Sequence, residues 1–257
     1  MSYKTTEITS SEELSDNVLH QRLFYPYVET AKQVSGQLLE IGCGFGRGVE
    51  TLLPHIDSYT AIDKNKTLID QLNAAHPEHH FLSKHIPPLS GIADEQFDSV
   101  VTFQVIEHIE DDELFLKEIH RVLKPGGKAF ITTPNIKWTL TRNPWHVREY
   151  KAIELRQLLN RFFSKVEMKA ISGDAKIMEY YERNKESVKK ITRFDVLNLQ
   201  YRLPRSLLQV PYELANRLNR KMLLKGNKSL VSDVSVDNYH LEDNPENGFD
   251  FFCMVEK

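Results

Sequence analysis

Residues 38–48 of this chain read LLEIGCGFGRG, a short apolar run that enters a glycine-rich turn. The apolar residues predict a buried strand that ends at Ile41, and the stretch after the glycines predicts a helix that ends before Pro54. Glycine lets the backbone take positive φ and lets a ligand approach the main chain closely. Because ligands of doubly wound sheets bind at the carboxyl ends of the strands, this turn is the predicted cofactor site.

The spacing of the glycines argues against two common nucleotide-binding loops. A dinucleotide fingerprint that begins at Gly42 needs glycine at position 47, where this chain has Arg47. The Gly-Lys-Ser/Thr ending of a triphosphate loop is also absent. Asp63 ends the next predicted strand, where a carboxylate can accept hydrogen bonds from both ribose hydroxyls. These features favour an adenosine ligand without a phosphate bridge.

Strands and helices are predicted to alternate on both sides of this turn. The predicted strands, besides 37–41, are 59–62, 80–82, 97–103, 128–133, 165–171 and 248–257. The predicted helical stretches are 11–35, 64–76, 110–124 and 151–163. Such an alternation predicts an α/β fold, a parallel sheet with helices on both faces.

The composition is that of an ordinary globular protein. Of 257 residues, 40% are hydrophobic and 27% charged, and the net charge of -3 argues against a general nucleic-acid binder. Two cysteines, Cys43 and Cys253, cannot form a disulfide framework and suit a reducing compartment. No apolar run reaches the length of a spanning helix, and the polar N-terminus lacks the apolar region of a secretory signal. We therefore expect a cytoplasmic protein, with peripheral membrane contact left open.

Four segments in this order resemble class I S-adenosylmethionine-dependent methyltransferases of the small-molecule type, such as those of ubiquinone and menaquinone biosynthesis. The segments are EIGCGFGRG at 40–48, Asp63, FDSVVTFQVIEHI at 97–109 and LKEIHRVLKPGGKAFITTPN at 116–135. One motif alone is weak, whereas four in the right context are specific. The resemblance implies S-adenosylmethionine as cofactor and a Rossmann-like, doubly wound, seven-stranded sheet. Its implied strand order is 3-2-1-4-5-7-6, and the last strand is antiparallel.

The resemblance also assigns roles around the glycine turn. Glu40 and the backbone of Gly42, Cys43 and Gly44 would hold the methionine part of the cofactor. Gly46 would allow close packing at the start of the helix. The small size of Cys43 suits this loop, and a redox role is not expected.

Further roles follow for the ends of the next strands. Asp63 would bind the ribose hydroxyls, and Lys64 would lie along the adenine. Phe103 and Gln104, at the end of the 97–103 strand, would face the methionine moiety and the methyl group.

The chain departs from the family pattern after the 80–82 strand. Many relatives place an aspartate there that accepts from the adenine amino group, whereas this chain has Lys84. Adenine recognition would then depend on backbone groups near His85 and Ile86, or on Asp94.

Two histidines are candidate general bases for an acceptor hydroxyl. His108 follows Glu107 after the 97–103 strand, and the alternative is a structural role for this pair. His146 lies in NPWHVREY at 143–150, and a similar segment recurs in methyltransferases of glycan, lipid and natural-product pathways. The alternative for His146 is a capped loop that enters the next helix. No metal site is predicted; the histidines at 76, 79 and 80 are expected on the surface.

The sequence predicts three parts: an N-terminal helical cover at 1–35, a cofactor-binding core at 36–173 plus 248–257, and an acceptor-binding insertion at 174–247. Residues 174–230 hold 13 basic and 6 acidic side chains, which favours an acceptor with phosphate or carboxylate. The segment 211–224 predicts an amphipathic helix with Leu214, Leu218 and Met222 on one side. We expect this helix to pack as a lid on the domain, with contact to an anionic lipid surface or a lipid-linked substrate as the alternative.

The predicted function is methyl transfer to a small-molecule, lipid-linked or carrier-linked acceptor, at oxygen and by in-line displacement. The alternative is a non-catalytic regulatory or scaffold protein that binds the cofactor; Arg47 counts against a nicotinamide dehydrogenase. No nucleic-acid partner is expected, and both a monomer and a homodimer fit. The acceptor, the methylated atom and any assistance by a metal are not specified by the sequence.

Overall fold

The computed structural model describes residues 13–193, 195, 198–226 and 228–257. They form two compact units. The sheet unit contains 26–137, 147–171 and 241–257, and the helical unit contains the described residues of 13–25, 138–146 and 172–240. The first twelve residues of the predicted helical cover lie outside the described residues.

The sheet has the predicted order with one additional edge strand. Its strands run in the order β3-β2-β1-β4-β5-β8-β6-β7. Their bounds are β1 Gln37–Ile41, β2 Ser58–Asp63, β3 His80–Ser83, β4 Phe97–Phe103, β5 Leu123–Pro134, β6 Lys165–Gly173, β7 Tyr239–Glu242 and β8 Asp250–Glu256. The pairs among β1 to β5 are parallel, and β8 lies antiparallel between β5 and β6. The predicted fold is confirmed, and the short β7 was missed because it has no apolar run.

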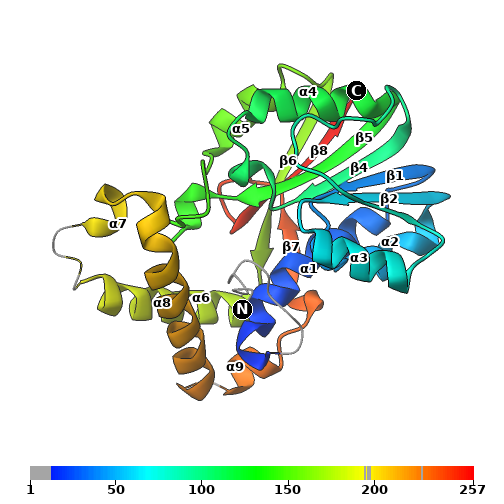
Figure 1. Cartoon of the computed structure of the whole chain (residues 1–257). Helices are drawn as coiled ribbons and strands as arrows, with labels where there is room; N and C mark the ends of the chain where they lie inside the picture. The colour runs from blue at the N-terminus through cyan, green and yellow to red at the C-terminus, as the bar shows by residue number, and fades with distance from the viewer. Residues whose placement is uncertain (1–12, 194, 196–197, 227) are drawn as a thin grey trace. The chain divides into compact units, whose positions relative to one another are not determined.

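Helices cover both faces of this sheet. The helices are α1 Asn17–Ala31, α2 Val49–Leu52, α3 Lys66–Ala75, α4 Asp112–Val122 and α5 Ala152–Leu159. Figure 1 shows α4 and α5 over one face and α2 and α3 over the other. Between α2 and β2, Pro54 lies in a short 3-10 turn, Leu53–His55, which ends the predicted helix.

The helix α4 buries one apolar face against the sheet unit. The side chain of Asp111 caps it by accepting a hydrogen bond from the Leu114 N–H at 2.9 Å. Phe115 and Ile119 are fully buried. The helix ends at Val122, two residues before the predicted end, because β5 begins at Leu123, which pairs with Phe97.

The alternation of strand and helix breaks between β3 and β4, where residues 84–96, all described, form a loop without a helix. Two side chains of α4 hold this loop. Glu118 accepts from the Leu89 N–H at 2.7 Å, and Arg121 donates to the Ile92 carbonyl at 2.9 Å. Arg121 also bonds the Asp94 carboxylate at 2.6 Å.

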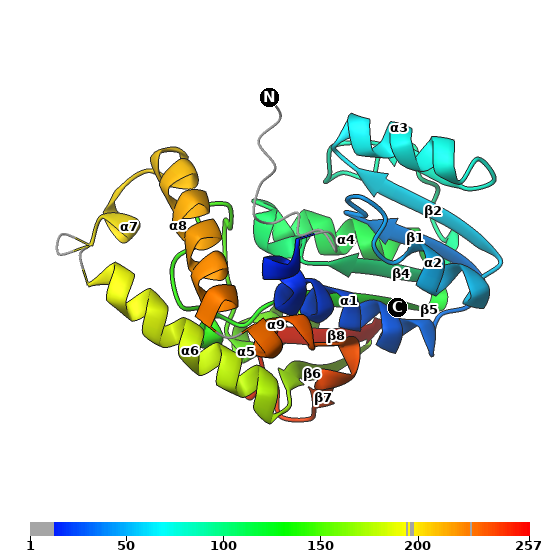
Figure 2. The same ribbon diagram turned by 90° about the horizontal axis from the view of Figure 1, so that it is seen from below.

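The helical unit is built around two long helices. Its elements are η1 Leu14–Asp16, α6 Ala175–Thr192, α7 Leu199–Arg202, α8 Arg205–Gly226, α9 Lys228–Ser232 and η5 Val236–Asn238. Figure 2 shows α6 and α8 as the longest of these. Hydrogen bonds join these two helices. Asn219 of α8 accepts from the Ser187 hydroxyl of α6 at 2.5 Å and donates to the Asn184 side chain of α6 at 2.7 Å.

Within the helical unit, α8 does not bury the side that was expected to pack. Leu214, Leu218 and Met222, the side expected to pack, are 59%, 62% and 53% exposed. The buried positions of the helix are instead Glu213, Asn219 and Leu223. The exposed face is therefore apolar, and the face toward α6 is largely polar.

No helix among the described residues combines the length and the apolar character needed to cross a bilayer.

Candidate functional site

The glycine turn follows β1 and is hydrogen-bonded to the end of β2. The Gly42 N–H donates to the Ile62 carbonyl at 2.7 Å. Gly42 has φ +82°, and a β-carbon there would collide with the Val105 side chain, so this position requires glycine. At Gly46, with φ +80°, a β-carbon would meet Leu72 of α3. The turn is thus packed between the loop after β4 and the helix α3.

Asp63 lies at the carboxyl end of β2 beside this turn. One carboxylate oxygen accepts from the Gly44 N–H at 3.0 Å, and the other accepts from the Asn65 N–H at 2.8 Å. Lys64, the next residue, is exposed. Two backbone donors therefore hold the Asp63 carboxylate at the turn, where a ribose-binding residue is expected.

Glu40 is buried within β1 and is bonded to two phenols. Its carboxylate accepts from the Tyr27 hydroxyl at 2.7 Å and from the Tyr59 hydroxyl. Burial raises the pKa of Glu40, and burial together with the neighbouring carboxylate raises the pKa of both tyrosines. Tyr27 also packs edge-on against Phe103, with ring centroids 4.8 Å apart. These contacts bring α1, β1, β2 and the end of β4 to one place.

Arg47 brings a cation to the same group of residues. Its side chain is half-buried, and its guanidinium lies 5.1 Å from the centroid of the Phe45 ring. Burial lowers the pKa of Arg47, and the neighbouring Tyr27 and Glu40 side chains oppose that shift. The buried acid Glu40 at the end of β1 and the half-buried base Arg47 in the glycine turn are therefore of opposite charge type.

The sequence prediction missed three residues of this group: Tyr27, Tyr59 and Arg47. Arg47 entered the sequence argument only as a departure from a dinucleotide loop. Tyr27 is one aromatic residue in a predicted helix, and Tyr59 one residue in a predicted strand. No local pattern marks either tyrosine as a partner of Glu40.

Gln104 directly follows β4 and is hydrogen-bonded to Thr132 of the neighbouring strand β5. Gln104 has φ +57°, which is uncommon for a residue other than glycine. Its N–H donates to the Thr132 carbonyl at 3.0 Å and its side-chain amide to the Thr132 hydroxyl at 3.3 Å. The two bonds hold this backbone conformation. Strained backbone of this kind is found preferentially at functional sites.

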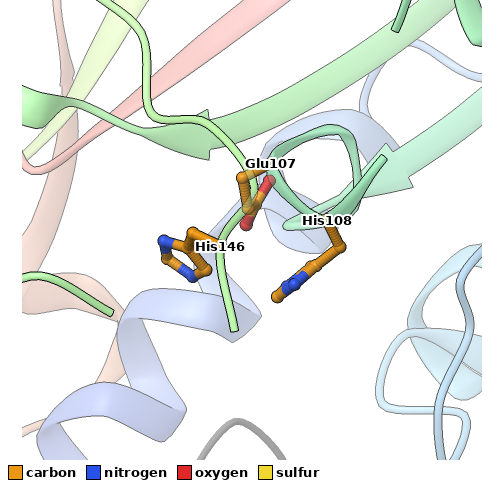
Figure 3. A group of neighbouring side chains, drawn as sticks. All are labelled: Glu107, His108 and His146. Carbon is orange, nitrogen blue, oxygen red and sulfur yellow. The ribbon is translucent and has the colours of Figure 1, made fainter. Parts of the chain in front are cut away.

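Glu107 and His108 lie on the 3-10 turn Ile106–His108 that follows β4 (Figure 3). The Glu107 carboxylate accepts from the Thr133 hydroxyl of β5 at 2.9 Å. Its carbonyl accepts from the N–H groups of Val147 and Arg148 at 2.7 and 3.2 Å. Glu107 thus ties this turn to two other segments, and His108 beside it is half-buried.

His146, which Figure 3 also labels, is the last residue of 138–146 in the helical unit. Its Nε2 lies 2.7 Å from the Asn143 side-chain amide, and its N–H donates to the Asn143 carbonyl at 3.2 Å. Arg205, at the start of α8, lies 3.4 Å from the His146 carbonyl. Asn143 therefore orients the imidazole.

The predicted adenine-side residues follow β3. The Lys84 N–H donates to the Asp63 carbonyl at 3.0 Å, which joins the ends of β3 and β2. His85 beyond it is exposed, and Ile86 is half-buried. Asp94, the alternative acceptor for the adenine amino group, is bonded to Arg121 instead.

Cys43 and the histidines at 76, 79 and 80 were not expected to take part in chemistry. Cys43 is buried and burial raises its pKa, so its thiol is not poised to ionise. His76 and His79, expected on the surface, are half-buried. Their rings pack near Phe81 and Tyr59, which leaves these two histidines only partly exposed. His80 is exposed as predicted.

Known proteins resemble the part of the chain that carries this site. Residues 39–131 match the family model described as a methyltransferase domain. A "Probable S-adenosylmethionine-dependent methyltransferase" of Mycolicibacterium smegmatis is 33% identical over 150 residues, 56% of this chain and 58% of the relative. A ubiquinone biosynthesis O-methyltransferase of Coxiella burnetii is 31% identical over 115 residues, 42% of this chain and 48% of the relative. The chain spans about half the length of the curated relatives it matches.

Solved structures resemble the chain over most of its length. A methyltransferase of Thermotoga maritima, described as a possible histamine N-methyltransferase, has a TM-score of 0.56 at 16% identity, covering 93% of this chain and 91% of that one. The cyclase SpnF has a TM-score of 0.53 at 15% identity, covering 92% and 81%. At such identities the likeness shows the fold alone.

The family match at 39–131 and the curated relatives confirm the predicted resemblance to S-adenosylmethionine-dependent methyltransferases. The first of these relatives is described as S-adenosylmethionine-dependent, which agrees with the cofactor expected from the resemblance.

Proposed function

We propose that this protein is an enzyme that transfers the methyl group of S-adenosylmethionine to an acceptor oxygen. The observation that carries the proposal is that the glycine turn is bordered by the buried acid Glu40 and the bonded carboxylate of Asp63 and contains the half-buried base Arg47. A methionine end carries one ammonium and one carboxylate, so it needs one anion and one cation. The methyltransferase domain at 39–131 contains all three residues.

The residues present fit this cofactor. Glu40 would bind the ammonium, Arg47 the carboxylate and Asp63 the ribose hydroxyls. Because burial raises the pKa of Glu40, a cation bound there would favour its ionised form. When bound, S-adenosylmethionine supplies a methyl group already activated on a sulfonium. The backbone of Gly42, Cys43 and Gly44 would complete the methionine side.

The remaining cofactor contacts are proposed from the resemblance. Lys64 and the backbone of His85 and Ile86 would border the adenine. Phe103 and Gln104 would border the methyl group, where the bonds of Gln104 to Thr132 keep the β4 end in place. Orientation of two reactants can supply roughly 7–11 kcal/mol of the lowering of a barrier.

We propose His108 and His146 as the two candidate general bases that would take the acceptor proton. The bond of Asn143 to the ring of His146 would hold that imidazole in one orientation. The bonds of Glu107 to Thr133, Val147 and Arg148 favour a structural role for the Glu107–His108 pair. Replacing a true general base lowers kcat by about 10²–10⁴-fold.

The acceptor part of the proposal rests on residues 174–247. The excess of basic side chains at 174–230, 13 basic against 6 acidic, favours a small-molecule, lipid-linked or carrier-linked acceptor with an anionic group. We propose that the protein works in the cytoplasm, because both cysteines are free thiols, as in a reducing compartment. We also propose that it is a monomer or a homodimer.

The first test is calorimetric titration of the full chain with S-adenosylmethionine and S-adenosylhomocysteine. We expect micromolar binding by the wild type, weakened on the order of 100-fold in Asp63→Ala, which loses acceptors for two hydroxyls. The matched control is Asp57→Ala, because Asp57 is exposed at the opposite end of the β2 region. Absence of binding by the wild type would overturn the proposal.

A second measurement separates the enzyme from a non-catalytic binding protein. Formation of S-adenosylhomocysteine is followed across an acceptor screen with the wild type, His108→Gln and His146→Gln. Loss of kcat with unchanged cofactor binding in one variant would identify the base. Intact cofactor binding with no turnover on any acceptor would favour the regulatory or scaffold alternative.

A further inference from the structure

The outer face of α8 carries a continuous line of exposed apolar side chains. We call it the α8 stripe; its members are Leu207, Val210, Leu214, Leu218 and Met222. Each is more than half exposed. Single exposed leucines are ordinary, whereas five at helical spacing along 22 residues form one contiguous surface.

The opposite face of α8 explains why the stripe does not turn inward. Asn219 is buried, and its side chain is hydrogen-bonded to Ser187 and Asn184 of α6. Arg220 bonds Asp16 at 2.9 Å. Turning the stripe toward α6 would leave these polar groups without their partners, which is costly in a buried place.

The charges along the stripe are of one sign. Arg217, Lys221 and Lys225 are exposed, whereas Glu213, the one acidic residue within 205–226, is buried. The surface offered by α8 is therefore apolar and basic, although the whole chain has a net charge of -3. Long basic side chains beside an apolar face can reach phosphate groups while their stems stay on the apolar surface.

We propose that α8 lies in the plane of an anionic lipid bilayer and docks the protein there through the α8 stripe. Apolar side chains on one face with basic residues around them are the features of an interfacial helix. A second copy of the chain fits this face less well, because a twofold contact would bring the basic residues of the two copies together. The proposal does not depend on the cofactor site or on catalysis.

The test is co-sedimentation of the full chain with vesicles of phosphatidylcholine alone and of phosphatidylcholine with roughly one third phosphatidylglycerol. We expect binding to the anionic vesicles that weakens as salt is raised. Leu214→Gln/Leu218→Gln should reduce the partition coefficient on the order of 100-fold, because two leucines no longer enter the lipid. Lys221→Gln/Lys225→Gln should reduce it by roughly 25-fold on anionic vesicles and leave it unchanged on neutral ones.

The matched control is Ile153→Gln, since Ile153 of α5 is 59% exposed and lies outside the stripe. This variant should bind vesicles like the wild type. Unchanged circular dichroism and unchanged S-adenosylmethionine binding would show that the stripe variants are folded.

Three results would overturn the proposal. The first is no binding of the wild type to anionic vesicles. The second is equal binding by the Leu214→Gln/Leu218→Gln variant. The third is a dimer in light scattering that this variant dissociates, with no vesicle binding by either, which would assign the stripe to a second copy.

Discussion

The helices α4 and α8 are both amphipathic, yet they bury opposite faces. In α4 the apolar side chains are inside, with Phe115 and Ile119 fully buried. In α8 the apolar Leu214 and Leu218 face outward, and Asn219 is inside.

The difference shows that a helical period indicates a face but does not say what covers it. The helix α4 joins two neighbouring parallel strands, β4 and β5, so its apolar face meets the apolar sheet. The helix α8 packs on α6, whose side chains at 184 and 187 are polar and bond Asn219. The partner therefore selects the buried face.

The largest test of this contrast compares one apolar residue in each helix, buried in α4 and exposed in α8. Phe115→Ala should lower the free energy of unfolding by about 3–5 kcal/mol, because the ring is fully buried. Leu218→Ala should change it by less than about 0.5 kcal/mol, because that side chain is already exposed. Urea denaturation followed by circular dichroism measures both. A loss at Leu218 as large as that at Phe115 would contradict the assignment of the exposed face.

A second test addresses the polar interior of α8. Asn219→Leu should destabilise the helical unit by about 1–3 kcal/mol, because it leaves Ser187 and Asn184 without a hydrogen-bond partner. The control is Lys221→Ala, at an exposed position of the same helix. Thermal unfolding monitored at the helical band gives both values. Stabilisation by Asn219→Leu would mean that α8 prefers an apolar partner face.

The smallest expected effect concerns pH and α4. The hydrogen bond from Arg121 holds the pKa of Glu118 below its ordinary value of 4.5. The lowered pKa stabilises the folded state above the ordinary pKa and loses this contribution as pH falls through the folded-state pKa.

The corresponding experiment measures unfolding of the wild type and Glu118→Gln between about pH 3 and pH 7. The two should differ by about 1 kcal/mol or less near neutrality, and the difference should shrink in acid. Glu186→Gln, at an exposed position of α6, is the control and should track the wild type at all pH values. A difference that grows in acid would have the wrong sign for this ion pair.

Much of the sheet unit could be predicted because its signals are local. The apolar run before Gly42, the β-branched run 97–103 and the final strand each stand out over a few residues. The resemblance then supplied their order, which the structure confirms. The edge strand β7 escaped prediction, because it has no periodic apolar pattern.

Some residues of the candidate site could be predicted from the sequence, and others could not. Gly42 and Asp63 were found because they lie at fixed positions after predicted strands. Tyr27 and Tyr59 were missed as partners of Glu40, since their hydroxyls reach it from a different helix and a different strand.

By itself, the sequence determined the class of fold, the glycine turn and the kind of cofactor, because these follow from short segments whose residues are neighbours in the chain. Only the tertiary structure decided which partners surround Glu40 and which face of α8 is exposed. Both depend on side chains that are distant in sequence, and burial favours whichever arrangement satisfies their polar groups.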